Sequence, residues 1–130
     1  MNRLQILVIS PTPFVAAFLT EHLATDRFAV QSVRPGTEAN AMGRAASLHV
    51  AVVDRIEQRP EAAQKEIALL KEAHPQVRII AISWNSSARD AGIVEQGLFY
   101  YWTGKPRPEL IELVEAAAAE LQREGGTLMR

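Results

Sequence analysis

The sequence contains no cysteine among its 130 residues, and only 6% of them are aromatic. The absence of cysteine excludes disulfide bonds, thiolate metal sites and a cysteine nucleophile. The chain also lacks an excess of either charge, since 14 basic and 15 acidic residues give a net charge of −1. A strongly basic surface for nucleic acid or anionic lipid is therefore not indicated.

No run of apolar residues approaches the length of a membrane span, and the first residues lack the pattern of a secretory signal. Hydrophobic residues make up 48% of the chain and charged residues 22%, which is typical of a globular protein. We expect a cytoplasmic protein with no membrane partner. Its length predicts one domain, over residues 1–124, followed by a flexible C-terminal tail over 125–130.

Five short runs of apolar residues are spaced along the chain. They cover Leu4–Ser10, Phe28–Val33, Leu48–Asp54, Val77–Ser83 and Leu98–Thr103. The first, third and fourth are nearly continuous in Val, Ile, Leu and Ala, which predicts strands buried on both faces of a parallel sheet.

Helical patterns lie between and after these runs. We expect the first helix to follow a Thr12 cap, with Pro13 at its first position. Further helices are expected over about 37–47, from Pro60 to His74, from a capping box at Ser87 and Asp90, and from Pro108 to a stop at Gly125. Five alternating strand–helix units predict an α/β fold of the flavodoxin-like, doubly wound type. Its five-stranded parallel sheet would have the order 2-1-3-4-5.

Function in such folds is found where the strands end at their carboxyl edge. Asp54 ends the third predicted strand, Ser83 ends the fourth, and Lys105 follows the fifth. A lysine beside an aspartate favours the ionised carboxylate. The lysine and a hydroxyl also suit the oxygens of a phosphoryl group carried on that aspartate.

This pattern resembles the receiver domain of two-component response regulators over nearly the whole chain, from Arg3 to about Glu124. Asp54, which closes the run HVAVVD, matches the phosphoacceptor of that family. Ser83, which closes RIIAIS, matches its switch hydroxyl, and Lys105 in GKP matches its lysine. The resemblance implies a signalling domain in a phosphorelay.

The sequence departs from the family where the metal would bind. The family carries two acidic residues after the first strand, which bind Mg²⁺ together with the phosphoacceptor, and this chain has Ser10 and Pro11 there. Arg55 adds a positive charge nearby, and the bulky Trp84 follows the switch hydroxyl. The loop of Ser10–Pro13 has no carboxylate and two prolines without N–H groups, so we expect it only to cap a helix.

We therefore predict an atypical receiver, or pseudo-receiver, that acts through protein–protein interaction with weak or no Mg²⁺-dependent phosphorylation. It would be no enzyme and would have no cofactor, with weak Mg²⁺ binding only if the site is active. One alternative is a functional phosphoacceptor in which a histidine kinase phosphorylates Asp54 and Ser83 and Lys105 hold the phosphoryl group. A second alternative is a small flavodoxin-like ligand-binding domain or enzyme.

Partners would be signalling proteins, such as a histidine kinase or an effector, and not nucleic acid. The aromatic run LFYYW makes Tyr100, Tyr101 and Trp102 candidates for an interface. In receivers the face formed by the fourth helix, fifth strand and fifth helix binds partners, which makes a homodimer through this face a further expectation. The three histidines, His22, His49 and His74, have no ligand-like spacing and are expected to be structural.

Overall fold

The computed structural model describes residues 3–36, 47–83, 100–103 and 108–128, with the side chains of 57, 100–103 and 124–128 excepted. Their elements are β1 (Leu4–Ile9), α1 (Phe14–His22), β2 (Phe28–Val33), β3 (Val50–Val53), the short 3₁₀ helix η1 (Ile56–Gln58), α3 (Pro60–Ala73), β4 (Arg78–Ser83), β5 (Tyr100–Thr103) and α4 (Pro108–Leu128).

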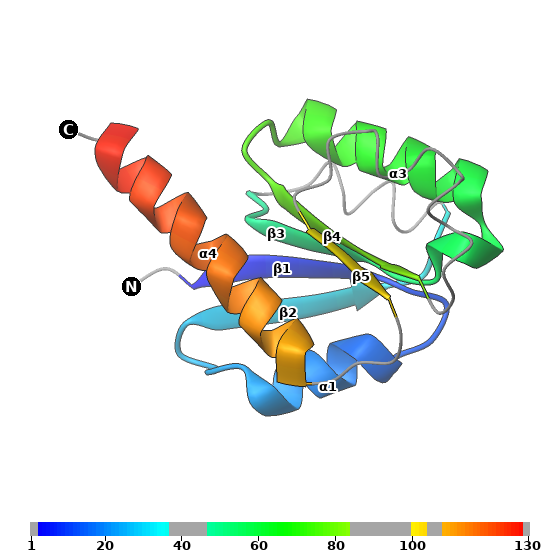
Figure 1. Ribbon diagram of the computed structural model, residues 1–130, viewed down its shortest axis with the longest axis horizontal. Coiled ribbons are helices and arrows are strands. Elements are labelled where there is room, and N and C mark those ends of the chain that lie inside the picture. The colour runs from blue at the N-terminus through cyan, green and yellow to red at the C-terminus, as the bar shows by residue number, and fades with distance from the viewer. Residues whose placement is uncertain (1–2, 37–46, 84–99, 104–107, 129–130) are drawn as a thin grey trace.

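The five strands form one parallel sheet in the order β2-β1-β3-β4-β5, which confirms the predicted flavodoxin-like topology. Helices α1 and α4 lie on one face of this sheet and α3 lies on the other (Figure 1). Each predicted apolar run contains one of the strands. The helices expected over 37–47 and from Ser87 fall almost wholly outside the described residues.

The sheet separates two layers of buried apolar side chains. Successive residues of β1 point to opposite faces, so Ile6 and Val8 join the layer under α1 and α4, whereas Leu7 and Ile9 join the layer under α3. Each fully buried side chain of this size stabilises the fold by about 1.5–3 kcal/mol. The inner strands are apolar on both faces because helices cover both.

Two helix boundaries differ from the prediction. Helix α1 begins at Phe14 with Pro13 as its N-cap, and no side chain caps it, so the expected Thr12 cap and the expected place of Pro13 at the first helical position are both wrong. Helix α4 continues through Gly125 to Leu128, so the expected stop at Gly125 is also wrong. A glycine costs a helix only about 1 kcal/mol relative to alanine, which an established helix of several turns tolerates.

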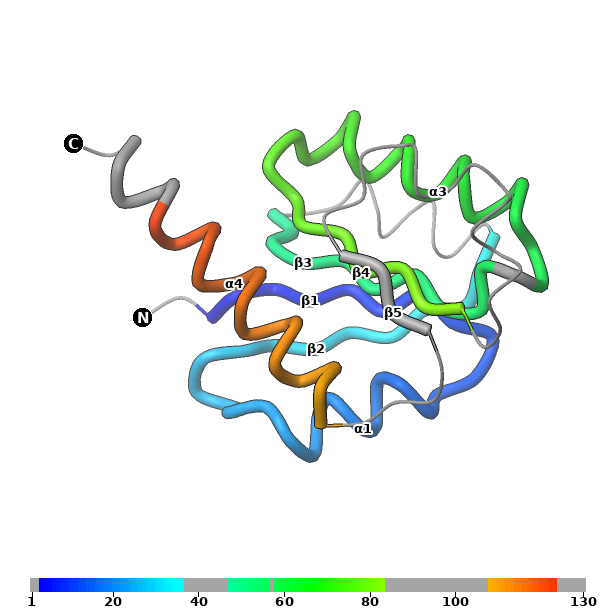
Figure 2. Tube along the Cα trace, in the orientation of Figure 1, coloured from blue at the N-terminus to red at the C-terminus, as the bar shows by residue number. Residues whose placement is uncertain are grey.

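The C-terminal end of α4 projects beyond the sheet (Figures 1 and 2). Nε of Arg78 in β4 lies 4.0 Å from Oε2 of Glu120 in α4. Within the described ranges, no helix combines the length and apolar character needed to cross a bilayer.

Candidate functional site

Ser10 and Asp54 meet at the carboxyl edge of the sheet because backbone pairing continues past the ends of their strands. The amide of Asp54 donates to the carbonyl of Ile9 at 2.9 Å, and the amide of Ser10 donates to that of Val33 at 3.1 Å. These bonds fix the residue after β1 and the residue after β3 beside each other. The carboxylate that the sequence singled out thus has a hydroxyl as its neighbour.

The carboxylate of Asp54 is fully buried, at 0% exposure, and its own chain supplies partners for both oxygens. The hydroxyl of Ser10 donates to Oδ2 at 2.8 Å, and the backbone N–H of Arg55 donates to Oδ1 at 2.8 Å. Nε of Arg55 also lies 4.0 Å from Oδ2. A buried carboxylate requires such hydrogen bonds and a nearby positive charge, and here both come from residues at the strand ends.

Arg55 has an unusual backbone conformation. Its φ of 54° and ψ of 45° lie in the left-handed region, and within the described ranges no other residue except glycine has a positive φ. This region is unfavourable for a long L side chain, so surrounding contacts must hold it. The conformation turns the N–H of Arg55 back toward the carboxylate of Asp54.

The side chain of Arg59 connects the loop after β3 to helix α3 through two hydrogen bonds. Its Nη2 donates to the backbone carbonyl of Asp54 at 3.0 Å, and its Nη1 donates to Oε1 of Glu66 at 2.7 Å. The side chains of Arg59 and Glu66 are only 15% and 5% exposed. Removal of either partner would leave a largely buried charge uncompensated, so the pair holds the loop in one geometry.

The loop of Ser10–Pro13 does not have the role that the sequence suggested. The hydroxyl of Ser10 accepts a hydrogen bond from the amide of Thr12 at 3.2 Å while it donates to Asp54. Ser10 therefore supports the carboxylate and orders its own loop, and it caps no helix. Sequence reasoning missed this contact because the two residues are 44 positions apart and a serine gives no distinctive signal.

The structure describes only some of the remaining predicted site residues. Ser83 ends β4, is fully buried, and pairs in register with Thr103 of β5. Lys105 and Trp84 lie outside the described residues. Tyr100, Tyr101 and Trp102 do form β5, at the edge of the sheet, but the description of this strand covers only its backbone.

Those residues at this edge that the structure describes do not fit a magnesium ion. Mg²⁺ requires near-octahedral oxygen ligands and usually takes one or more carboxylates in addition to water. Asp54 supplies one carboxylate, Ser10 uses its proton on that carboxylate, and the side chain of Pro11 has no donor atom. Across the residues that the structure describes, no three His, Asp or Glu side chains are grouped to hold a metal.

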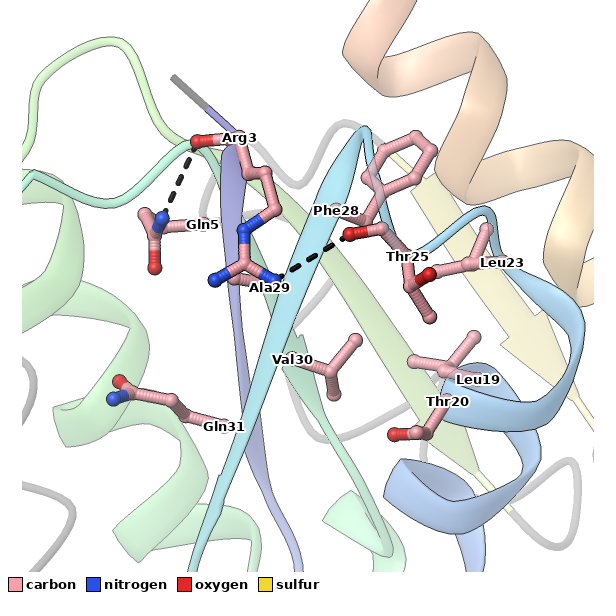
Figure 3. Close-up of a pocket in the computed structure, with 10 residues that line it drawn as sticks. All are labelled: Arg3, Gln5, Leu19, Thr20, Leu23, Thr25, Phe28, Ala29, Val30 and Gln31. Carbon is pink, nitrogen blue, oxygen red and sulfur yellow. Dashed lines mark hydrogen bonds between the residues drawn. The ribbon is translucent and has the colours of Figure 1, made fainter. Parts of the chain in front are cut away.

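A separate hollow of about 410 Å³ lies beside β2, near the amino end of β1 (Figure 3). Two of its polar side chains already have partners there: Nη1 of Arg3 donates to the carbonyl of Thr25 at 3.4 Å, and Nε2 of Gln5 donates to the carbonyl of Arg3 at 3.2 Å. Leu19, Val30 and their neighbours form the rest of its lining. It lies away from the carboxyl edge and brings together no acid–base pair.

The three histidines are placed apart, as expected. His22 ends α1, His74 caps the C-terminus of α3, and His49 precedes β3. Nδ1 of His49 accepts a 2.8 Å hydrogen bond from the backbone N–H of Gln5, and burial lowers the pKa of this imidazole. An acceptor nitrogen carries no proton, so both observations indicate a neutral ring that joins β3 to β1.

No family model matches the chain, and no curated protein matches its sequence. Solved structures do. A CheY-like receiver domain protein from Methanospirillum hungatei JF-1 is 15% identical, with 95% of this chain and 99% of that chain covered and a TM-score of 0.79. A second match is the receiver domain of a sensor histidine kinase from Pseudomonas aeruginosa PAO1, which has a magnesium ion coordinated in its active-site cleft. It is 19% identical, with 93% of this chain and 99% of that chain covered and a TM-score of 0.69.

A response regulator from Burkholderia pseudomallei, with a phosphorylated aspartic acid, a calcium ion and citrate, is 24% identical. The match covers 94% of this chain and 72% of that one, with a TM-score of 0.70. At these identities the likeness establishes the fold. The chain therefore has the fold of response-regulator receiver domains.

Proposed function

We propose that this chain is an atypical receiver domain of a two-component signalling system, which acts through protein–protein interaction rather than Mg²⁺-dependent phosphorylation of Asp54. One observation carries the proposal: the carboxylate of Asp54 is buried and bonded to Ser10 and Arg55. The proposal assigns no catalysed reaction and no cofactor to the domain. It keeps the receiver fold as a scaffold for recognition.

Phosphorylation would require one oxygen of Asp54 to attack phosphorus while a metal ion neutralises the charge that gathers on the phosphoryl oxygens. The Burkholderia pseudomallei protein has a phosphorylated aspartic acid and the Pseudomonas aeruginosa domain has a coordinated magnesium ion. Here Ser10 and Pro11 follow β1 and supply no second carboxylate. Oδ2 of Asp54 already accepts a hydrogen bond from Ser10, which the attack would have to break.

The proposal can be tested with a small phosphodonor. The purified protein would be incubated with acetyl phosphate and MgCl₂, and its intact mass recorded, with the Burkholderia pseudomallei regulator as a reactive control. We expect no phosphoryl group on this chain under conditions that modify the control. Stoichiometric, Mg²⁺-dependent phosphorylation that disappears in Asp54→Asn would overturn the proposal in favour of a functional phosphoacceptor.

The functional phosphoacceptor is a second candidate because Asp54 follows β3 and Ser83 ends the neighbouring strand β4, so the carboxylate and the hydroxyl lie at the same edge of the sheet. In that case Ser83 and Lys105 would hold the phosphoryl group, and a histidine kinase would be the donor. Folded Asp54→Asn protein would then lose its signalling output, whereas the atypical receiver predicts that Asp54→Asn retains it.

The proposed partner surface includes β5 and helix α4. Support comes from the position of β5 at the edge of the sheet and from the aromatic sequence of Tyr100, Tyr101 and Trp102. A signalling protein or a second copy of the chain would bind there. Light scattering of wild type and Tyr101→Ser would test the homodimer: a concentration-dependent dimer that Tyr101→Ser weakens supports it, and monomers of both argue for a different partner.

A further inference from the structure

Arg55 contacts the buried carboxylate of Asp54 in two ways. Its backbone N–H donates to Oδ1 at 2.8 Å, and its guanidinium Nε lies 4.0 Å from Oδ2. A negative charge with 0% exposure is unfavourable unless hydrogen bonds and a positive charge compensate it. Arg55 supplies one of the hydrogen bonds and a compensating charge.

The left-handed backbone of Arg55 accompanies these contacts. Its φ of 54° is a conformation that an arginine adopts only where the surroundings enforce it. The side chain is only 21% exposed and its Nε atom is buried, so this part of the guanidinium is withdrawn from water beside the carboxylate. In such surroundings the attraction between the two charges is screened less than at an open surface.

We propose that Arg55 is a tethered counter-cation, which takes the electrostatic place of a divalent metal ion at Asp54 and makes the site exclude such ions. This inference rests on the proposed function and deepens it by naming the residue that excludes the metal. A divalent cation that approaches Oδ2 meets the guanidinium on one side, and the Ser10 hydroxyl already occupies another position on that oxygen. The local positive charge disfavours the incoming one.

A double-mutant cycle tests whether Arg55 and Asp54 are coupled. Urea midpoints would be measured for wild type, Arg55→Gln, Asp54→Asn and the double variant, with Arg34→Gln as a control because Arg34 is an exposed arginine at the same edge. We expect Arg55→Gln to lower the midpoint in the wild-type background and to lower it much less in the Asp54→Asn background. Equal shifts in both backgrounds would overturn the inference.

A cation titration provides a second test that does not depend on Asp54→Asn. Ser10→Asp adds a carboxylate at the strand end, and its Mg²⁺ affinity would be compared with that of Ser10→Asp/Arg55→Gln by amide NMR. We expect the Kd of the double variant to be lower by about tenfold, because the competing charge is gone. The expected tenfold change corresponds to about 1.4 kcal/mol in the free energy of binding. Kd values within about twofold of each other would show that Arg55 hardly opposes the metal and would overturn the inference.

The two proposals fail in different ways. Mg²⁺-dependent phosphorylation of the wild-type chain on Asp54 would contradict the proposed function whatever the cycle shows. If the effects of Arg55→Gln and Asp54→Asn on stability were additive and the chain were not phosphorylated, the proposed atypical receiver would stand. Only the proposed role of Arg55 would then be overturned. Arg55→Lys tests whether the positive charge or the shape of the guanidinium matters. It keeps a cation beside Asp54, so we expect it to retain most of the coupling energy between residues 55 and 54.

Discussion

The hydroxyl of Ser10 donates a 2.8 Å hydrogen bond to Oδ2 of Asp54, although the two residues are 44 positions apart in the sequence. Ser10 is 2% exposed and Asp54 is 0% exposed, so water does not replace this bond. The contact joins the end of β1 to the end of β3. It also gives the carboxylate a donor at a position where a magnesium site would require a second acid.

Removal of this donor should destabilise the fold. Ser10→Ala leaves Oδ2 of a buried carboxylate without its hydroxyl partner, and we expect a loss of about 1–3 kcal/mol in the free energy of unfolding. Urea unfolding followed by circular dichroism would measure the loss. Ser32→Ala is the control because Ser32 is exposed in β2. A loss no larger than that of the control would show that the Ser10 bond contributes little.

The backbone at residue 55 predicts an order of stability between two variants that both lack the guanidinium. Glycine adopts a φ of 54° without the steric cost that alanine meets there. Arg55→Gly should therefore be more stable than Arg55→Ala by about 1 kcal/mol in urea unfolding. If Arg55→Ala proved at least as stable as Arg55→Gly, the left-handed conformation would not be present in solution.

The buried ion pair between Arg59 and Glu66 predicts that removing one partner lowers the free energy of unfolding much more than replacing both partners with apolar residues. Glu66→Ala leaves Arg59 without its carboxylate and should cost about 3 kcal/mol. The variant Arg59→Met/Glu66→Leu buries no charge but still loses the hydrogen bond from Arg59 to the carbonyl of Asp54, so it should cost about 1 kcal/mol, well below the loss in Glu66→Ala. Thermal and urea unfolding would measure the stability of both variants. Equal losses of stability in the two variants would contradict a buried ion pair.

Burial of His49 predicts a pH dependence of stability. Its pKa is lowered from the ordinary 6.5, so the folded chain takes up the proton less readily than the unfolded chain. The contribution of the neutral ring is therefore full above about pH 6.5 and is lost as the pH falls below that value.

The matched variant is His49→Asn, which keeps an acceptor near the backbone N–H of Gln5 and does not titrate. Between about pH 7.5 and about pH 5.5, the urea midpoint of wild type should fall more than that of His49→Asn. Parallel pH profiles for the two proteins would show that His49 is not held neutral.

Much of the fold could be predicted from the sequence because strands covered on both faces leave a strong signal. The nearly continuous apolar runs around Ile6 and Ile80 lie at the centre of the sheet and are buried, and the prolines Pro60 and Pro108 begin the helices expected there. Boundaries were less predictable. Gly125 was expected to end a helix that in fact continues to Leu128, because the turns already formed carry a glycine at small cost.

The candidate site was predictable only in part. Asp54 and Ser83 could be placed because each ends a predicted strand, and strand ends meet at one edge of a parallel sheet. The partners of Asp54 could not be found in the same way. The bond from Ser10 depends on long-range pairing, and the role of Arg55 depends on a left-handed backbone that its residue type disfavours.

We propose that the hydrogen bonds from Ser10 and Arg55 occupy the carboxylate of Asp54, which is therefore not a Mg²⁺-dependent phosphoacceptor. The most direct measurement is an amide ¹H–¹⁵N NMR titration of the wild-type protein, first with millimolar Mg²⁺ and then with beryllofluoride, which mimics the aspartyl phosphoryl group. We expect the peaks of Ser10, Asp54, Arg55 and Ser83 to stay in place. Saturable shifts of these peaks would contradict it and would show a site that still accepts metal and phosphoryl group.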